Sequence, residues 1–98
     1  MKVIYKYTLE LVDFQFVDMP KNAKILSAQV QHGQPRLWAV CDPELPMQGR
    51  RVFMIRTGNP LFNGLAPGVV YIDTIQDGIL VWHVFAENDW PYIDSENR

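Results

Sequence analysis

Hydrophobic and polar residues alternate along most of the chain with a period of two. In "VIYKYTLE", Val3, Tyr5 and Tyr7 alternate with Lys6 and Thr8, the pattern of a half-buried strand. Almost no segment shows the 3.6-residue period of an amphipathic helix, and only the C-terminal segment could form a short helical turn. The pattern predicts strands at residues 3–10, 13–19, 25–31, 36–41, 51–57, 69–75 and 79–85.

Turn residues join these strands into hairpins. His32-Gly33-Gln34-Pro35 lies between two predicted strands, and Asp77-Gly78 lies between the last two. Asp-Gly between two β-rich runs is the strongest short-range hairpin signal. Short strands separated by Gly/Pro turns are typical of a sandwich or a partly open barrel. We therefore predict an all-β fold of about seven strands, mainly antiparallel hairpins, with little or no helix.

Two of the predicted strands are apolar on both faces. They are "RVFMIRT" at residues 51–57 and "ILVWHVF" at residues 79–85. A strand of this kind has to be covered on both sides. The loop 58–68, which carries Leu61, Phe62 and Leu65, could act as a lid over the second side, and so could another copy of the chain. Large exposed apolar faces are rare on monomers, so we expect a homo-oligomer.

The composition is that of one globular domain. The chain has 98 residues, of which 48% are hydrophobic and 20% charged. We assign residues 1–86 to a single β domain and residues 87–98, "ENDWPYIDSENR", to an acidic, aromatic C-terminal tail whose Trp90-Pro91-Tyr92 could dock onto a neighbouring subunit. No apolar run approaches the roughly 20 residues of a membrane span. The absence of an export signal and the single cysteine favour the cytoplasm.

Charge and motifs exclude several classes of function. The net charge is −2 and no basic stripe occurs, so we do not expect binding to a nucleic-acid polymer. His32, His83 and Cys41 lack the spacing of metal ligands, and no cofactor-binding signature is present. No cation lies beside Cys41 to activate its thiol. We predict no catalytic residue, no metal and no cofactor, and we expect His83 to be a core residue with one ring nitrogen hydrogen-bonded.

Arg36 and Trp38 form the first candidate for ligand binding. They lie two residues apart on one predicted strand and so project from the same face. There the guanidinium could pair with a phosphate while the indole stacks on a base. The alternative interpretation is structural, with Trp38 in the core and Arg36 extending toward solvent at the start of the strand.

The segment "IRTGNP" is the second candidate. Arg56, the Thr57 hydroxyl and the backbone amides around Gly58 and Asn59 could hold an anion where the strand enters the loop. A purely structural turn is the alternative. Trp82 could face a pocket beneath the loop, or it could be a core residue. The candidate ligand-binding residues are therefore Arg36, Trp38, Arg56, Thr57, Asn59 and Trp82.

Several longer segments resemble a known family. The runs "IYKYTLEL", "AKILSAQVQHGQPRLWA", "RTGNP" and "LVWHVF" resemble small proteins carried by bacteriophages and prophages and described mainly as a domain of unknown function. The likeness covers about residues 3–86. It implies an all-β phage accessory protein acting in the cytoplasm of the bacterial host, and it implies no catalytic residues.

Small non-enzymatic phage proteins commonly counteract host defence, and two mechanisms fit this chain. One is sequestration, in which an oligomer encloses a cyclic or ADP-ribose-type nucleotide signal. The other is inhibition of a host defence or metabolic enzyme through the tail or the loops. A structural or assembly accessory protein is a further alternative. We favour sequestration, because it uses Arg36, Trp38, Arg56 and the apolar loop together.

Overall fold

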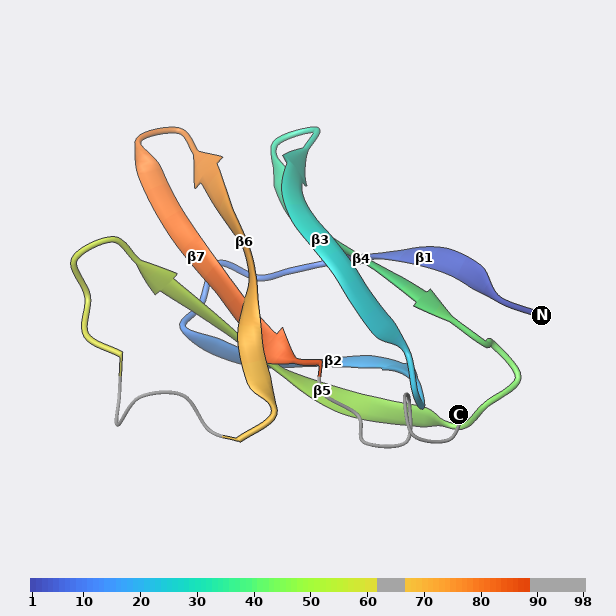
Figure 1. Ribbon diagram of the computed structural model, residues 1–98. Helices are drawn as coiled ribbons and strands as arrows, with labels where there is room; N and C mark the ends of the chain where they lie inside the picture. The colour runs from blue at the N-terminus through green and yellow to red at the C-terminus, as the bar shows by residue number, and fades with distance from the viewer. Residues whose placement is uncertain (62–66, 89–98) are drawn as a thin grey trace.

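Seven β-strands form the fold, and no helix occurs among residues 1–61 and 67–88, which the computed structural model describes (Figure 1). The strands are β1 (Val3–Thr8), β2 (Phe14–Pro20), β3 (Lys24–Gln31), β4 (Gln34–Cys41), β5 (Met47–Arg56), β6 (Val69–Asp77) and β7 (Leu80–Glu87). Without a helix, these residues contain no helical segment that could cross a membrane. The predicted all-β fold with seven strands is confirmed.

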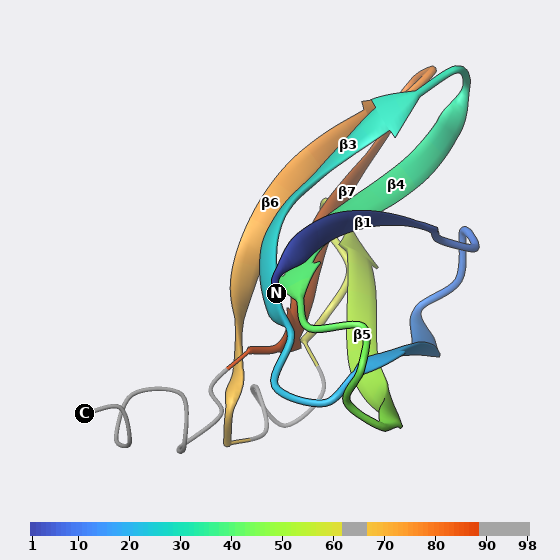
Figure 2. The same cartoon turned by 90° about the vertical axis from the view of Figure 1, so that its right-hand side faces the viewer.

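The strands form two antiparallel sheets that face one another. The small sheet has the order β1-β4-β3, and the large sheet has the order β2-β5-β7-β6. Strands β3 and β6 run side by side at one border between the sheets (Figures 1 and 2). They belong to separate sheets, so the structure is not closed into a barrel. This arrangement agrees with the predicted sandwich or partly open barrel.

Both predicted hairpins are present. The β3–β4 turn has His32 and Gly33 at φ angles of 53° and 75°, as a two-residue type I′ turn requires. In the β6–β7 hairpin, Asp77 pairs with Leu80, so the turn consists of Gly78 and Ile79. Gly78 has φ 65°, which places the residue that tolerates positive φ at the first turn position.

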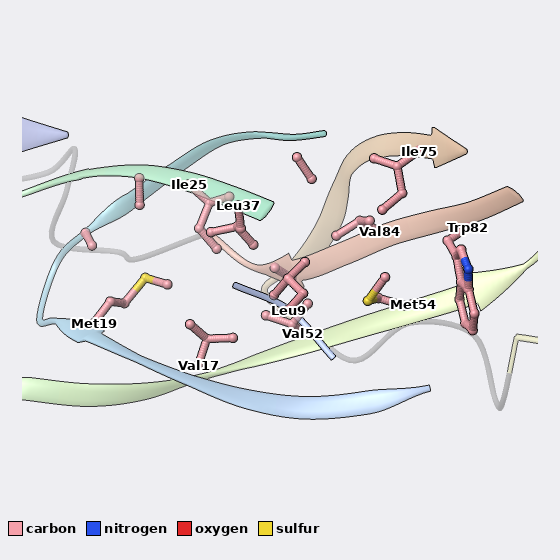
Figure 3. Packing of buried hydrophobic residues seen from close by; sticks show 14 of the residues in the cluster. Leu9, Val17, Met19, Ile25, Leu37, Val52, Met54, Ile75, Trp82 and Val84 are labelled. Carbon is pink, nitrogen blue, oxygen red and sulfur yellow. The ribbon is translucent and has the colours of Figure 1, made fainter. Parts of the chain in front are cut away.

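The hydrophobic core lies between the inner faces of the two sheets (Figure 3). Leu37 of the small sheet and Val52, Met54 and Val84 of the large sheet are 0% exposed. Burying a side chain of this size contributes roughly 1.5–3 kcal/mol. The core explains why the two sheets pack together. The full cluster is Leu9, Val17, Met19, Ala23, Ile25, Ala28, Leu37, Ala39, Cys41, Val52, Met54, Ile75, Trp82, Val84 and Ala86.

Polar side chains join the sheets where β3 approaches β6 and the end of β7. The Asn88 side chain accepts a hydrogen bond from the Ile25 N–H at 2.8 Å and donates one to the Ile25 carbonyl at 2.9 Å. Asp73 Oδ2 accepts a hydrogen bond from the Ala28 N–H at 3.2 Å. These side chains bond to backbone groups of β3 that would otherwise pair with a neighbouring strand, so they join the two sheets at a border without a strand ladder.

A buried arginine completes this border. Arg50 on β5 is 0% exposed, and its Nη1 donates to the Glu87 carbonyl at 2.8 Å. Its Nη2 donates to the carbonyl of Ala23, which precedes β3. A buried guanidinium is tolerated only with such partners. Arg50 therefore connects β5, the end of β7 and the entry to β3.

The outer face of the large sheet carries a row of aromatic side chains. Phe14, Phe53, Phe85 and Tyr71 are direct cross-strand neighbours on β2, β5, β7 and β6. Phe14 is 43% exposed and Tyr71 is 55% exposed. We call these four residues the aromatic row. The expectation that β5 and β7 are apolar on both faces is thus confirmed, whereas self-association remains a prediction.

Parts of two predicted segments lie outside the described residues. They are residues 62–66 of the loop, with Phe62 and Leu65, and residues 89–98 of the tail, with Trp90-Pro91-Tyr92. The preceding two residues of the predicted tail are described. Glu87 ends β7, and Asn88 makes the two hydrogen bonds to Ile25.

Candidate functional site

A pocket of about 250 Å³ lies at the end of β5 on the outer face of the large sheet. It borders the aromatic row, with which it shares Phe85. Its lining combines a cation, a hydroxyl, an amide, an imidazole and apolar groups, the mixture typical of small-molecule sites. We call it the β5 pocket. The lining residues are Ile55, Arg56, Thr57, Gly58, Asn59, Leu61, His83 and Phe85.

A tight turn holds the polar side of the β5 pocket. The Asn59 N–H donates to the Arg56 carbonyl at 3.0 Å, and the Thr57 N–H donates to the Val81 carbonyl at 3.2 Å. Gly58 has φ 93°, and a Cβ added to it would meet no atom within 4 Å. The backbone at Gly58 therefore borders open space. The turn places Arg56, Thr57 and Asn59, three of the predicted ligand-binding residues, in the lining of one pocket, with Thr57 bonded to His83 and the Arg56 guanidinium extending toward Trp82.

A chain of hydrogen bonds fixes His83 on the same face. Its Nε2 lies 2.8 Å from Thr57 Oγ1, and its Nδ1 lies 3.0 Å from Thr74 Oγ1. Thr74 Oγ1 is in turn 2.7 Å from the Tyr71 hydroxyl. Hydroxyls can donate or accept, so this chain accommodates either neutral tautomer of the imidazole. The ring is thereby held in one orientation beside the pocket.

His83 is therefore not the core residue that the sequence suggests. The register places it opposite Ile55 on the outer face of the large sheet, where it is half-buried and both ring nitrogens have partners. Strand β7 is apolar on both faces, so its pattern does not show which side each residue takes. A polar residue between the apolar Trp82 and Val84 was a sequence signal that position 83 faces outward, but Val81 and Phe85, apolar on the same face, masked it.

Trp82 belongs to the core and not to the pocket wall (Figure 3). The indole is 6% exposed, and the Arg56 guanidinium carbon lies 5.8 Å from the ring centroid. A cation at this distance from an indole is attracted to its face. Trp82 therefore acts on the β5 pocket indirectly, by restricting the position of Arg56.

Arg36 and Trp38 project from the outer face of the small sheet, so within one chain they do not join the β5 pocket. Both are half-buried, and Trp38 is absent from the core cluster. Trp38 pairs with Lys6 on β1 and with Ser27 on β3. Arg36 Nη1 donates to Thr8 Oγ1, which ties the guanidinium to β1. The predicted common face of Arg36 and Trp38 is present, and the core interpretation of Trp38 is not.

Cys41 is a buried residue at the end of β4 with no role at the pocket. It is 2% exposed, and burial raises the pKa of its thiol. A protonated, inaccessible thiol is a poor nucleophile and a poor metal ligand. Within residues 1–61 and 67–88, no group of three or more His, Cys, Asp or Glu side chains could hold a metal ion.

A family model described as "Domain of unknown function (DUF7352)" matches residues 1–92. The chain belongs to this family. No curated protein and no solved structure matches the chain. The predicted resemblance to a family of unknown function is thus confirmed, and its association with bacteriophages stays a prediction. The DUF7352 family model names no ligand, so a ligand for this chain has to be inferred from the side chains of the β5 pocket.

Proposed function

We propose that this protein is a non-enzymatic bacteriophage accessory protein that binds and sequesters a nucleotide-type immune signal in the cytoplasm of the bacterial host. The observation that supports the proposal is the composition of the β5 pocket. Arg56, Thr57 and Asn59 contribute polar groups to its lining, and Phe85 and Leu61 supply apolar surface. A nucleotide presents the matching chemistry, a phosphate and a planar base.

The phosphate would lie at the turn. The Arg56 guanidinium can donate two parallel hydrogen bonds to phosphate oxygens, and such charge-assisted bonds are stronger than neutral ones. Gly58 allows the backbone to approach the anion closely, because no side chain stands in the way. The contact of Arg56 with Trp82 limits the freedom that the guanidinium would lose on binding.

The base would lie against Phe85 and the His83 ring. Aromatic surfaces stack on nucleobases with little dependence on sequence. Small-molecule pockets commonly have volumes of roughly 300–1,000 Å³. At about 250 Å³ the β5 pocket is slightly smaller than this range, so one pocket would enclose part of a nucleotide ligand and not the whole of a cyclic di- or trinucleotide. A larger signal would therefore have to span the pockets of more than one copy, which agrees with the expected homo-oligomer.

Sequestration requires that the ligand stay intact. The one thiol of the chain is buried with a raised pKa, and the His83 ring nitrogens are both occupied by threonine hydroxyls. Neither group is poised to attack a bound nucleotide. Inhibition of a host enzyme by protein contact remains the second mechanism, and the absence of nucleotide binding would favour it.

A thermal-shift panel tests the proposal. Cyclic di- and trinucleotides, cyclic ADP-ribose isomers and nucleoside monophosphates are each titrated into the protein, and the shift is evaluated where the free ligand reaches about one hundred times its fitted Kd. Binding to the folded state alone then stabilises it by about 2.7 kcal/mol, which raises Tm by roughly 10–20 °C for a domain of this size. An unchanged Tm with every nucleotide would contradict sequestration.

Charge-removing variants locate the site. Arg56→Ala should weaken binding about 10- to 100-fold, because it removes a charged hydrogen-bond donor to phosphate. Lys21→Ala is the matched control, since it removes a positive charge from an exposed turn outside the pocket. Arg36→Ala tests the other predicted arginine. A loss with Arg36→Ala and none with Arg56→Ala would move the site to the small sheet.

A further inference from the structure

The aromatic row forms a continuous apolar surface across the outer face of the large sheet. Its four members follow one another across all four strands, with ring centroids 5.0 Å apart for Phe14–Phe53 and 5.7 Å apart for Tyr71–Phe85. Phe16, beside the row, is 63% exposed and packs edge-to-face on Phe14 at 5.1 Å. We call the row together with Phe16 the aromatic face. A contiguous apolar surface of this kind marks an interaction site.

The aromatic face can supply the apolar centre of a dimer interface. Aromatic side chains bury roughly 150–250 Å² each. Phe14, Phe16 and Tyr71, which are 43%, 63% and 55% exposed, therefore leave roughly 300 Å² of side-chain surface in water. The half-buried Phe53 and Phe85 add to it. This forms a substantial apolar centre for an interface of standard size, which covers roughly 800 Å² on each partner.

The ion pair on this face is neutral overall. Arg51 and Glu87 form an ion pair at 2.8 Å, and Arg51 Nε donates a second bond to Glu87 Oε2. The two charges neutralise one another within the chain, so they offer no field that selects a partner of opposite charge. Interfaces between identical subunits are the more apolar class.

We propose that a second copy of this chain packs its aromatic face onto that of the first. A two-fold axis that runs in the interface plane and parallel to the strands places β5 of one copy over β7 of the other. Phe53 then lies opposite the second copy's Phe85, and Phe14 lies opposite the second copy's Tyr71. The aromatic row thus maps onto itself, as an isologous dimer requires. Sheets packed in this way lie roughly 10 Å apart.

The dimer also covers the open side of the β5 pocket. Phe85 belongs to both the aromatic row and the pocket, and Ile55 and His83 occupy the next positions along β5 and β7. A second copy seated on the row therefore borders the pocket and adds to the wall that the described residues form. This consequence for ligand binding rests on the proposed function, whereas the dimer itself does not.

Sedimentation equilibrium of the full chain without nucleotide tests the dimer. The matched variants are Phe16→Glu, on the aromatic face, and Ile4→Glu, on the outer face of the small sheet, where the replaced residues are 63% and 60% exposed. The wild-type chain and Ile4→Glu should sediment at twice the 11.4 kDa of one chain at micromolar concentrations. Phe16→Glu should raise the dimer Kd at least tenfold, because it replaces an apolar contact with a charged group that must lose its water in the interface.

Three results would overturn the proposal. They are a wild-type monomer at high micromolar concentration, equal weakening by both variants, and weakening by Ile4→Glu alone, which would indicate pairing through the edge strand β1. A wild-type chain that is monomeric and binds a different protein through Phe16 would also overturn the proposal. Circular dichroism shows whether each variant folds. If Phe16→Glu fails to fold, Tyr71→Glu takes its place in the experiment, because Tyr71 is 55% exposed on the same face. Leaving nucleotide out keeps this result independent of ligand binding.

Discussion

The side-chain amide of Asn88 pairs with both backbone groups of Ile25, 63 positions earlier in the chain. Oδ1 accepts from the Ile25 N–H at 2.8 Å, and Nδ2 donates to the Ile25 carbonyl at 2.9 Å. Ile25 is 3% exposed, so water has little access to these groups. One amide thus takes the place of a strand partner at the border between the sheets.

Asn88→Ala should therefore destabilise the fold. It leaves the N–H and the carbonyl of Ile25 without these partners, which costs about 1–3 kcal/mol in the free energy of unfolding. Urea titration followed by circular dichroism measures the change. Asn59→Ala, in an exposed turn, is the control and should change the stability by less than about 0.5 kcal/mol. Equal midpoints for Asn88→Ala and wild type would show that the amide bonds contribute nothing.

The neighbouring arginines on β5 should differ in their effect on stability. Arg50 is 0% exposed and bonds the carbonyls of Ala23 and Glu87, so Arg50→Ala leaves a cavity and removes two cross-sheet bonds. We expect a loss of about 3 kcal/mol or more. Arg51→Ala removes a partly exposed ion pair and should cost about 1 kcal/mol or less. The denaturant midpoints of the two variants measure their stability. A larger loss of stability for Arg51→Ala than for Arg50→Ala would contradict the role of buried Arg50 in joining the sheets.

The Tyr7 hydroxyl should lose its proton at a higher pH than the hydroxyl of an ordinary tyrosine. Burial, followed by the neighbouring Cys41, raises the pKa of Tyr7 from 10.0 to about 12. The folded state therefore keeps a proton that the unfolded state loses. This contribution to stability is fully present below about pH 10 and is lost as the pH rises through about 12.

Tyrosinate absorbance measures this titration. The wild-type protein should show a step near pH 12 that is missing in Tyr7→Phe. Tyr5→Phe, at a position 43% exposed on the same strand, should leave that step in place. If Tyr7→Phe removes amplitude near pH 10 instead, the hydroxyl is not held in its neutral form.

The Cys41 thiol should react only after unfolding. It is 2% exposed and burial raises its pKa, so an aromatic disulfide reagent at mildly alkaline pH should modify it slowly in the native protein and rapidly in urea. Ile79→Cys, at a position 94% exposed, adds one fast thiol as an internal control. Fast modification of the native wild-type chain would contradict the burial of Cys41.

The strands were predictable because local signals determine them. Alternation along β1 and the turns at His32-Gly33 and Gly78 involve residues close in sequence, and the predicted hairpins formed. The pairing of β1 with β4 and of β2 with β5 was not predictable. These pairs join residues far apart in the chain, and a period of two carries no information about partners.

The face of the sheet to which each side chain points was equally unpredictable from the sequence. Phe14 and Phe16 point outward, whereas Gln15 points inward, where its Nε2 donates to the Glu10 carbonyl at 2.9 Å and lies 3.6 Å from Met54 Sδ. Hydrophobicity alone would place Phe14 and Phe16 in the core and Gln15 on the outer face, which is the opposite of their orientation in β2.

The candidate site was only partly predictable, for the same reason. Arg56, Thr57 and Asn59 lie within four positions, so their shared turn could be recognised. The contribution of His83 depends on the register of β5 with β7, which only the folded chain shows.

Mass spectrometry of the protein isolated from phage-infected bacteria tests whether it sequesters a nucleotide. We predict that heat denaturation releases a chemically intact nucleotide from the wild-type protein. The amount of bound nucleotide should fall in Arg56→Ala and stay unchanged in Lys21→Ala. A protein that carries no nucleotide under these conditions, or one that releases a converted product, would contradict sequestration at the β5 pocket.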